Sequence, residues 1–120
     1  MKIILAITAL LFSANCFALT GNELHDLITS ENAYTKIEGD SYIMGVMDTI
    51  GVYRPIEISL AARKKRKPNL DLIICPDNVI YKQGYDLVKN YLTNHPETRN
   101  QQASVLVYKA LSEAWPCPAQ

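Results

Sequence analysis

Histidine and cysteine, the residue types best suited to nucleophilic and metal chemistry, are few in this 120-residue chain and do not stand at useful spacings. The two histidines, His25 and His95, are far apart in sequence, and neither a His-x-x-x-His nor a Cys-x-x-Cys pair is present. The Gly-x-Ser-x-Gly elbow of serine hydrolases is also missing from the sequence. We therefore expect structural roles for both histidines and a protein that is not an enzyme, with no catalytic residue, no metal ion and no cofactor.

The glycines give no sign of a phosphate-binding loop. Gly45, Gly51 and Gly84 are isolated, whereas such loops need several glycines close together. We interpret Gly45 and Gly51 as positions where a helix approaches a neighbour closely.

The first 18 residues have the three parts of an export signal. Lys2 supplies the positive start, residues 3–12 form an apolar run too short to span a bilayer, and small residues precede a cleavage site after Ala18. A lipoprotein signal ending at Cys16 is the alternative, but Asn15 is a poor residue before a lipidated cysteine. We predict a mature domain of residues 19–120 without a membrane span, located in the periplasm or secreted.

Two cysteines, Cys75 and Cys117, remain once Cys16 leaves with the signal. In an oxidising compartment a single disulfide is the default outcome for such a pair. A nucleophilic cysteine is the alternative, and it is disfavoured because both sulfurs stand beside prolines at the ends of predicted elements. The loop is long (117 − 75 = 42), so the chain-entropy view gives it up to about 4 kcal/mol of stability.

Charge is balanced overall but clustered locally. Without Lys2 the chain has 11 basic and 12 acidic residues, a net charge of −1, which predicts no nucleic-acid partner. Five consecutive cations nevertheless occur together: Arg63, Lys64, Lys65, Arg66 and Lys67. The run is either a solvated loop or a contact for an acidic partner surface.

Apolar spacing predicts an all-α fold, a small compact bundle of about four or more helices. Thr20 and Glu23 fit a capping box for a helix over about residues 22–32. Asp40 or Ser41 would cap a second helix, which we expect Pro55 to end or bend.

The next segment, residues 56–74, is ambiguous between a hairpin carrying the basic run and a helix extending toward Pro68. A third helix is predicted from an apolar stripe over residues 81–92, and a fourth from about residue 97 to 114 after a tight turn at His95-Pro96. If these two helices are antiparallel, Cys75 and Cys117 meet at the open end of a helical hairpin.

Aromatic residues favour binding over catalysis. The mature domain has seven tyrosines and Trp115, which suit contact surfaces, although the tyrosines could equally fill the edge of a small core. Tyr108 lies off the inward stripe of the last helix and shares a face with Val105, which predicts a second apolar surface and a possible dimer contact.

An ordered set of motifs resembles the Rap/Tai family of type VI secretion immunity proteins. Its pieces run from residue 42 to 118 and are Tyr42-Ile43-Met44-Gly45-Val46-Met47-Asp48, Cys75-Pro76, Gln83, Asp86-Leu87-Val88-Lys89-Asn90-Tyr91-Leu92, His95-Pro96-Glu97, Arg99, Ala103, Ala110-Leu111 and Ala114-Trp115-Pro116-Cys117. The chain departs from the pattern at Ile80, where a capping Thr is usual, and near Lys82, where a Gly is usual.

The resemblance implies a helical periplasmic protein, often dimeric, that binds a peptidoglycan amidase delivered by a type VI apparatus. Inhibition would be steric, with a protruding loop entering the cleft of the enzyme. Our own assignment places that element at residues 54–69, because long loops on rigid scaffolds often carry recognition. We expect Arg54 and the five cations of residues 63–67 to contact the partner.

A small periplasmic acid-stress chaperone is the alternative from another class. Such proteins depend on many carboxylates and histidines whose titration exposes apolar surface. With 12 acidic residues and two histidines the chain is ordinary in this respect.

Overall fold

The computed structural model describes residues 18–71 and 73–118, so most of the predicted export signal lies outside the described residues. Four α-helices and one 3-10 turn follow one another in the described part: α2 (Gly21–Thr29), α3 (Ala33–Arg63), α4 (Tyr81–Asn94), η1 (Pro96–Thr98) and α5 (Ala103–Ala114). The predicted all-α fold is confirmed. None of the described helices is long and apolar enough to cross a membrane.

The predicted capping box opens α2. The Oγ1 atom of Thr20 accepts from the backbone N–H of Glu23 at 3.3 Å, and the Glu23 carboxylate accepts from the Thr20 N–H at 2.7 Å. These bonds hold the pKa of Glu23 below its usual value. The helix ends at Thr29, earlier than predicted, because Asn32 instead caps α3 by accepting from the N–H groups of Tyr34 and Thr35.

The predicted bounds of the second helix are wrong at both ends, since α3 runs for 31 residues. Asp40 lies inside the helix, and the helix continues through Pro55. A proline leaves the carbonyl four residues earlier, here that of Gly51, without its helical donor. Both residues are exposed and a Cβ at Gly51 would meet nothing within 4 Å, so water can reach this part of the helix and the proline is tolerated. The helical alternative for residue 56 onward therefore holds as far as Arg63.

The third helix follows its predicted stripe, with Val88 and Leu92 fully buried, but the last helix begins later than predicted. Pro96–Thr98 forms a single 3-10 turn, and α5 starts only at Ala103. The residues between them serve another element: the carbonyls of Arg99 and Gln101 accept from the first N–H groups of α2, at Asn22 and Gly21. The linker is thus a cap for a helix 80 residues away, which local spacing does not reveal.

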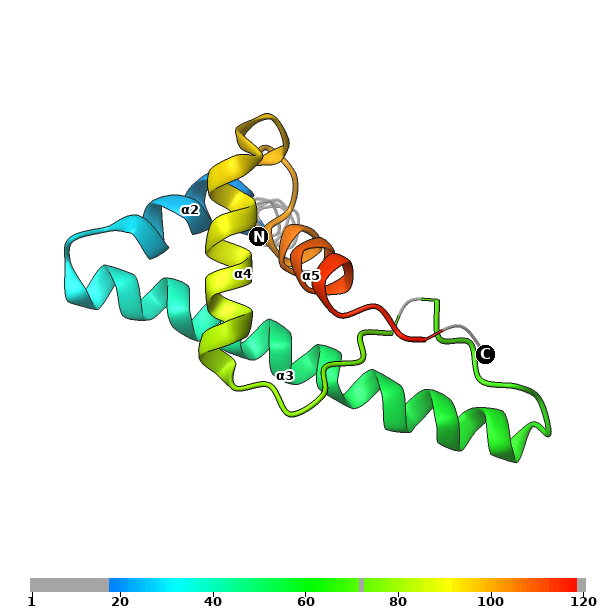
Figure 1. Ribbon diagram of the computed structural model, residues 1–120. Coiled ribbons are helices and arrows are strands. Elements are labelled where there is room, and N and C mark those ends of the chain that lie inside the picture. Colours follow the sequence, from blue (N-terminus) through cyan, green and yellow to red (C-terminus); the bar gives the residue numbers. More distant parts are fainter. Residues whose placement is uncertain (1–17, 72, 119–120) are drawn as a thin grey trace, which may run out of the picture.

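One apolar core joins all four helices. Its buried members are Leu24, Ile28, Ile43, Ile74, Val88, Leu92, Ala103, Leu106, Val107, Ala110 and Leu111. In Figure 1, α4 crosses α3 steeply and α5 lies beside α4, while the C-terminal half of α3 projects beyond them.

The close approaches occur at other glycines than predicted. A Cβ at Gly84 would lie 2.6 Å from the sulfur of Met47, whereas Gly45 and Gly51 have nothing within 4 Å. Our interpretation of Gly45 and Gly51 as helix contacts is therefore wrong.

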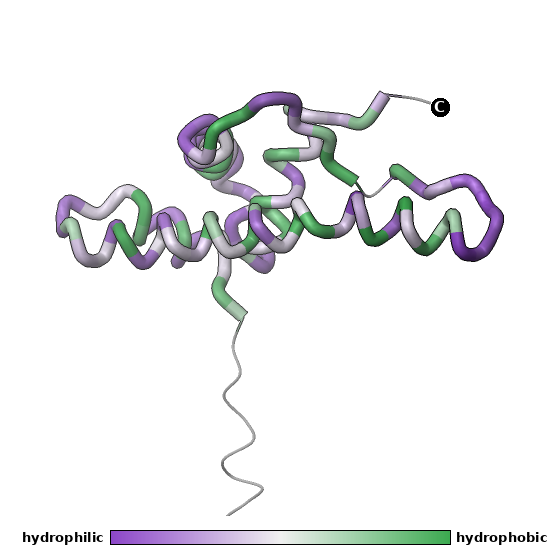
Figure 2. The backbone as a smooth tube through the Cα atoms, turned by 90° about the horizontal axis from the view of Figure 1, so that it is seen from below, coloured by the Kyte–Doolittle hydropathy of each residue, from purple (hydrophilic) through white to green (hydrophobic). Residues whose placement is uncertain are grey.

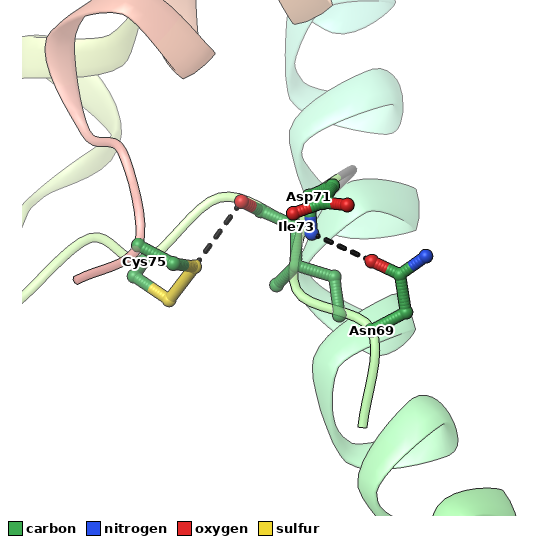
Figure 3. Close-up of a disulfide and its surroundings, with 5 residues drawn as sticks. Asn69, Asp71, Ile73 and Cys75 are labelled. Atoms are coloured by element: carbon green, nitrogen blue, oxygen red, sulfur yellow. Dashed lines mark hydrogen bonds between the residues drawn. A yellow bond between two sulfur atoms is a disulfide. The ribbon is translucent and has the colours of Figure 1, made fainter. Parts of the chain in front are cut away.

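The predicted Cys75–Cys117 disulfide is present, with an S–S distance of 1.98 Å and a Cα–Cα distance of 4.8 Å. It joins the segment before α4 to the segment after α5, and the Cys75 N–H donates to the Trp115 carbonyl beside it. Figure 3 shows the Ile73 carbonyl facing the disulfide, 3.1 Å from the Cys117 sulfur. Because a bridged sulfur has no proton to donate, this is a polar contact and not a hydrogen bond.

Candidate partner-binding surface

The predicted contact residues lie at the far end of α3. We call residues 63–67 the basic tip; all five side chains are exposed, and in Figure 2 the tip is the hydrophilic turn at the end of the long helix. Arg54 is also exposed, but it lies within the helix, nine residues before Arg63. Residues 54–63 are therefore helical, and the long irregular loop that we expected is only a short turn and its continuation.

The basic tip has a defined backbone conformation. Lys64 caps α3, Lys65 has a left-handed φ of 49°, and the N–H groups of Lys65 and Arg66 donate to the carbonyls of Ala62 and Ala61. This is the Schellman arrangement that closes many helices. Its left-handed position is usually glycine, and a side chain there costs about 1 kcal/mol.

A group of side-chain bonds holds the basic tip against the helix; we call Glu57, Arg66 and Asn69 the clasp. The Glu57 carboxylate accepts from both terminal nitrogens of Arg66, at 2.6 and 3.0 Å, and from the Asn69 N–H at 2.6 Å. Arg66 also donates to the Lys67 carbonyl at 3.0 Å. The Arg66 and Asn69 bonds lower the pKa of Glu57 to about 2.

The clasp divides the five predicted contact cations. Arg66 is engaged by Glu57, while Arg63, Lys64, Lys65 and Lys67 form no salt bridge with any described residue. Four like charges are therefore displayed on an ordered turn, and the fifth is used to order it.

An apolar groove beside α3 was not predicted. One hollow of ≈ 620 Å³ adjoins the clasp and is lined by Ile50, Tyr53, Ile56, Glu57, Leu60, Asn69, Ile73 and Tyr108. A second of ≈ 580 Å³ continues it toward Tyr42 and Ser104 and shares Ile50, Tyr53 and Tyr108. The available signal was the placing of apolar residues around the whole circumference of α3, since a helix of that kind is normally covered on more than one side.

The predicted apolar surface of the last helix adjoins this groove. Tyr108 is half-buried and lines both hollows, whereas Val105 is 42% exposed. The two residues stay a predicted dimer contact.

The histidines have structural surroundings, as expected. His95 Nδ1 lies 2.9 Å from the Tyr91 carbonyl and the ring stacks on Tyr91 with centroids 4.3 Å apart. His25 Nδ1 lies 3.7 Å from an Asp26 oxygen. Within residues 18–71 and 73–118 no three His, Cys, Asp or Glu side chains are grouped so that they could hold a metal ion.

These features describe a small, disulfide-linked, all-α protein with an ordered basic projection. A family model for Rap1a immunity proteins matches residues 20–117, and the chain belongs to this family. The match confirms the resemblance seen in the motifs and extends it to α2 and to the segment around the basic tip. Effector immunity is the general function that the family assigns. A search of curated proteins finds no match to the chain.

Proposed function

We propose that the protein is a periplasmic immunity protein that binds a type VI secreted peptidoglycan amidase and blocks it sterically. The observation that carries this proposal is the basic tip, an ordered cluster of exposed cations at the end of a projecting helix in a chain of the Rap1a immunity family. Blocking a cleft requires shape and contact only, so the chain needs no catalytic group of its own.

The geometry suits insertion into a cleft. A helix of 31 residues is about 46 Å long, and its C-terminal half extends beyond the other helices in Figure 1. Four free cations would steer the tip toward an acidic surface and make association fast and salt-sensitive. The apolar groove at the base of the tip offers additional area for the same partner.

Export of the mature chain, residues 19–120, belongs to the same proposal. A disulfide persists in an oxidising compartment, and the predicted signal ending at Ala18 would deliver the chain there. A periplasmic immunity protein would meet the amidase where the enzyme reaches its peptidoglycan substrate.

Dimerisation through Val105 and Tyr108 is a further part of the proposal. The groove beside Tyr108 carries exposed apolar side chains of α3, and a second subunit could cover them. Sedimentation of the mature protein with and without Val105→Asp measures this: loss of a dimer supports the contact, and a monomer in both excludes it.

The test of function is capture from the type VI secretome of the producing strain, with mature protein as bait and mass spectrometry as readout. One variant changes Arg63, Lys64 and Lys67 to Ser, which leaves the clasp intact. The matched control changes Lys36, Lys82 and Lys89, three exposed lysines away from the tip, to Ser and so removes the same charge.

Stoichiometric capture of an amidase by the wild type and the control, but not by the tip variant, is the expected result. Equal capture by all three would move the contact elsewhere, toward the Tyr108 face. No capture by any bait would contradict the immunity proposal and direct attention to client binding at acidic pH.

A further inference from the structure

The Glu57 side chain joins three parts of the molecule that would otherwise be independent. It stands on α3 six residues before the helix ends, it accepts both terminal nitrogens of Arg66 on the turn, and it accepts the Asn69 amide beyond Pro68. Its side chain is 19% exposed, less than the 41% of Arg66, so the carboxylate is the inner partner. A bidentate pair of this geometry is more specific than an ordinary surface ion pair.

The basic tip needs such a tie because its own backbone and charges oppose its conformation. Lys65 holds a left-handed φ without being glycine, and five adjacent cations repel one another. The Schellman bonds fix the turn only as far as Arg66. From Lys67 to Asn69 the clasp supplies the polar contacts, through the Lys67 carbonyl and the Asn69 amide.

We propose that Glu57 is a positioning residue, which locks the basic tip into one conformation for binding an acidic protein surface. This inference rests on the proposed function. Glu57 itself need not touch the partner: by engaging Arg66 it fixes the directions in which Arg63, Lys64, Lys65 and Lys67 are presented. Only the fraction of molecules with the tip in this conformation would bind, so affinity depends on the tie.

Positioning and simple electrostatics predict opposite effects of removing this carboxylate. Loss of a negative charge beside a basic tip makes the surface more positive and should speed association with an acidic partner. Loss of a positioning group should instead weaken binding, because the tip then samples several conformations. The sign of the change therefore separates the two explanations.

The test compares Glu57→Ala with Asp71→Ala, which changes the net charge equally. Asp71 is exposed, and only its backbone N–H is bonded in this region, to the side chain of Asn69 (Figure 3). The first readout is the hydrogen-exchange rate of the Asn69 amide by NMR, which requires no partner. The second is the rate and affinity of binding to the amidase captured in the pull-down.

We expect Glu57→Ala to speed Asn69 exchange and to weaken amidase binding by about tenfold, while Asp71→Ala changes neither exchange nor affinity in that direction. Unchanged Asn69 exchange in Glu57→Ala would overturn the clasp. Faster exchange with affinity equal to or above that of Asp71→Ala would overturn positioning and leave the immunity function standing. If the Arg63, Lys64 and Lys67 variant binds the amidase as well as wild type does, the proposed site itself fails, irrespective of the exchange result.

Discussion

The two halves of α3 are held by different kinds of interaction. The N-terminal half has Gly39 and Ile43 buried, and a Cβ at Gly39 would collide with Ile28 of α2. In the C-terminal half only Ala61 is buried, and apolar side chains such as Val52 and Ile56 are 50% exposed. The first half is part of the core, and the second projects from it.

Polar and covalent ties replace burial in the projecting half. The clasp holds the turn at one end of the return segment, residues 67–71 and 73–75, and the disulfide holds its other end. Burial is non-directional and stabilises the whole fold, whereas a bidentate pair or a disulfide fixes a particular position. The comparison teaches that this chain separates its sources of stability from its means of presenting a surface.

The largest effect should come from emptying the core. Leu92 is fully buried, so Leu92→Ala should lower the free energy of unfolding by about 4 kcal/mol through lost burial and a cavity. Ile58→Ala, at a site 47% exposed in the projecting half, should change it by less than about 0.5 kcal/mol. Urea denaturation of both variants measures the difference. Equal losses would contradict the division of α3 into two halves.

Removal of the disulfide should have the next largest effect. Replacing Cys75 and Cys117 together by Ser should cost about 3 kcal/mol, less than the loop-entropy limit, because the return segment keeps its backbone bond to Trp115. Urea denaturation of the double variant and of the wild type gives this value. The Asn69 amide, held by Glu57, should keep its protection from exchange; loss of that protection would mean that the two ties are not independent.

Two glycines of the helical bundle should respond to alanine with opposite signs. Gly84→Ala places a Cβ against Met47 and should destabilise by about 1 kcal/mol, with the flexible end of Met47 absorbing part of the clash. Gly45→Ala meets nothing within 4 Å in an exposed stretch of α3 and should stabilise by about 0.5–1 kcal/mol. Thermal unfolding of both proteins tests the pair, and a loss at Gly45 would show that a surface covers this part of α3 in solution.

Local signals predicted the elements, and non-local ones decided their bounds. The capping box at Thr20 and the stripe of α4 could be read directly, because all the interacting groups are within a few residues. The start of α5 could not, since the residues before it are held by α2. Pro55 misled because the standard rule assumes a carbonyl without access to water, and Gly51 leaves that carbonyl exposed.

The site was predicted in part. A run of five cations is evident in any sequence, but the sequence does not show that Arg66 is paired and the other four are free. That distinction depends on Glu57, nine residues away, whose reach to Arg66 requires the helix to continue through Pro55. The error in the helix boundary and the missed clasp therefore have one cause.

The smallest effect expected, and the sharpest contrast between the regions, lies in their pH limits. The pKa of Glu57 is lowered to about 2 from 4.5, so its carboxylate orders the tip fully above pH 4.5 and is lost only as the pH falls through about 2. Burial raises the pKa of Tyr81 to about 12 from 10, so the contribution of its neutral phenol is present below pH 10 and is lost as the pH rises through 12.

An NMR titration of the Asn69 amide should therefore show a change near pH 2, absent in Glu57→Ala, with little effect on global stability. Alkaline unfolding followed by circular dichroism should shift to higher pH in Tyr81→Phe and stay unchanged in Glu57→Ala. A change at Asn69 between pH 4 and 5 would mean that Glu57 titrates as a free carboxyl. The clasp would then be open at neutral pH for much of the time, and the basic tip would have to be ordered by its partner on binding instead of beforehand.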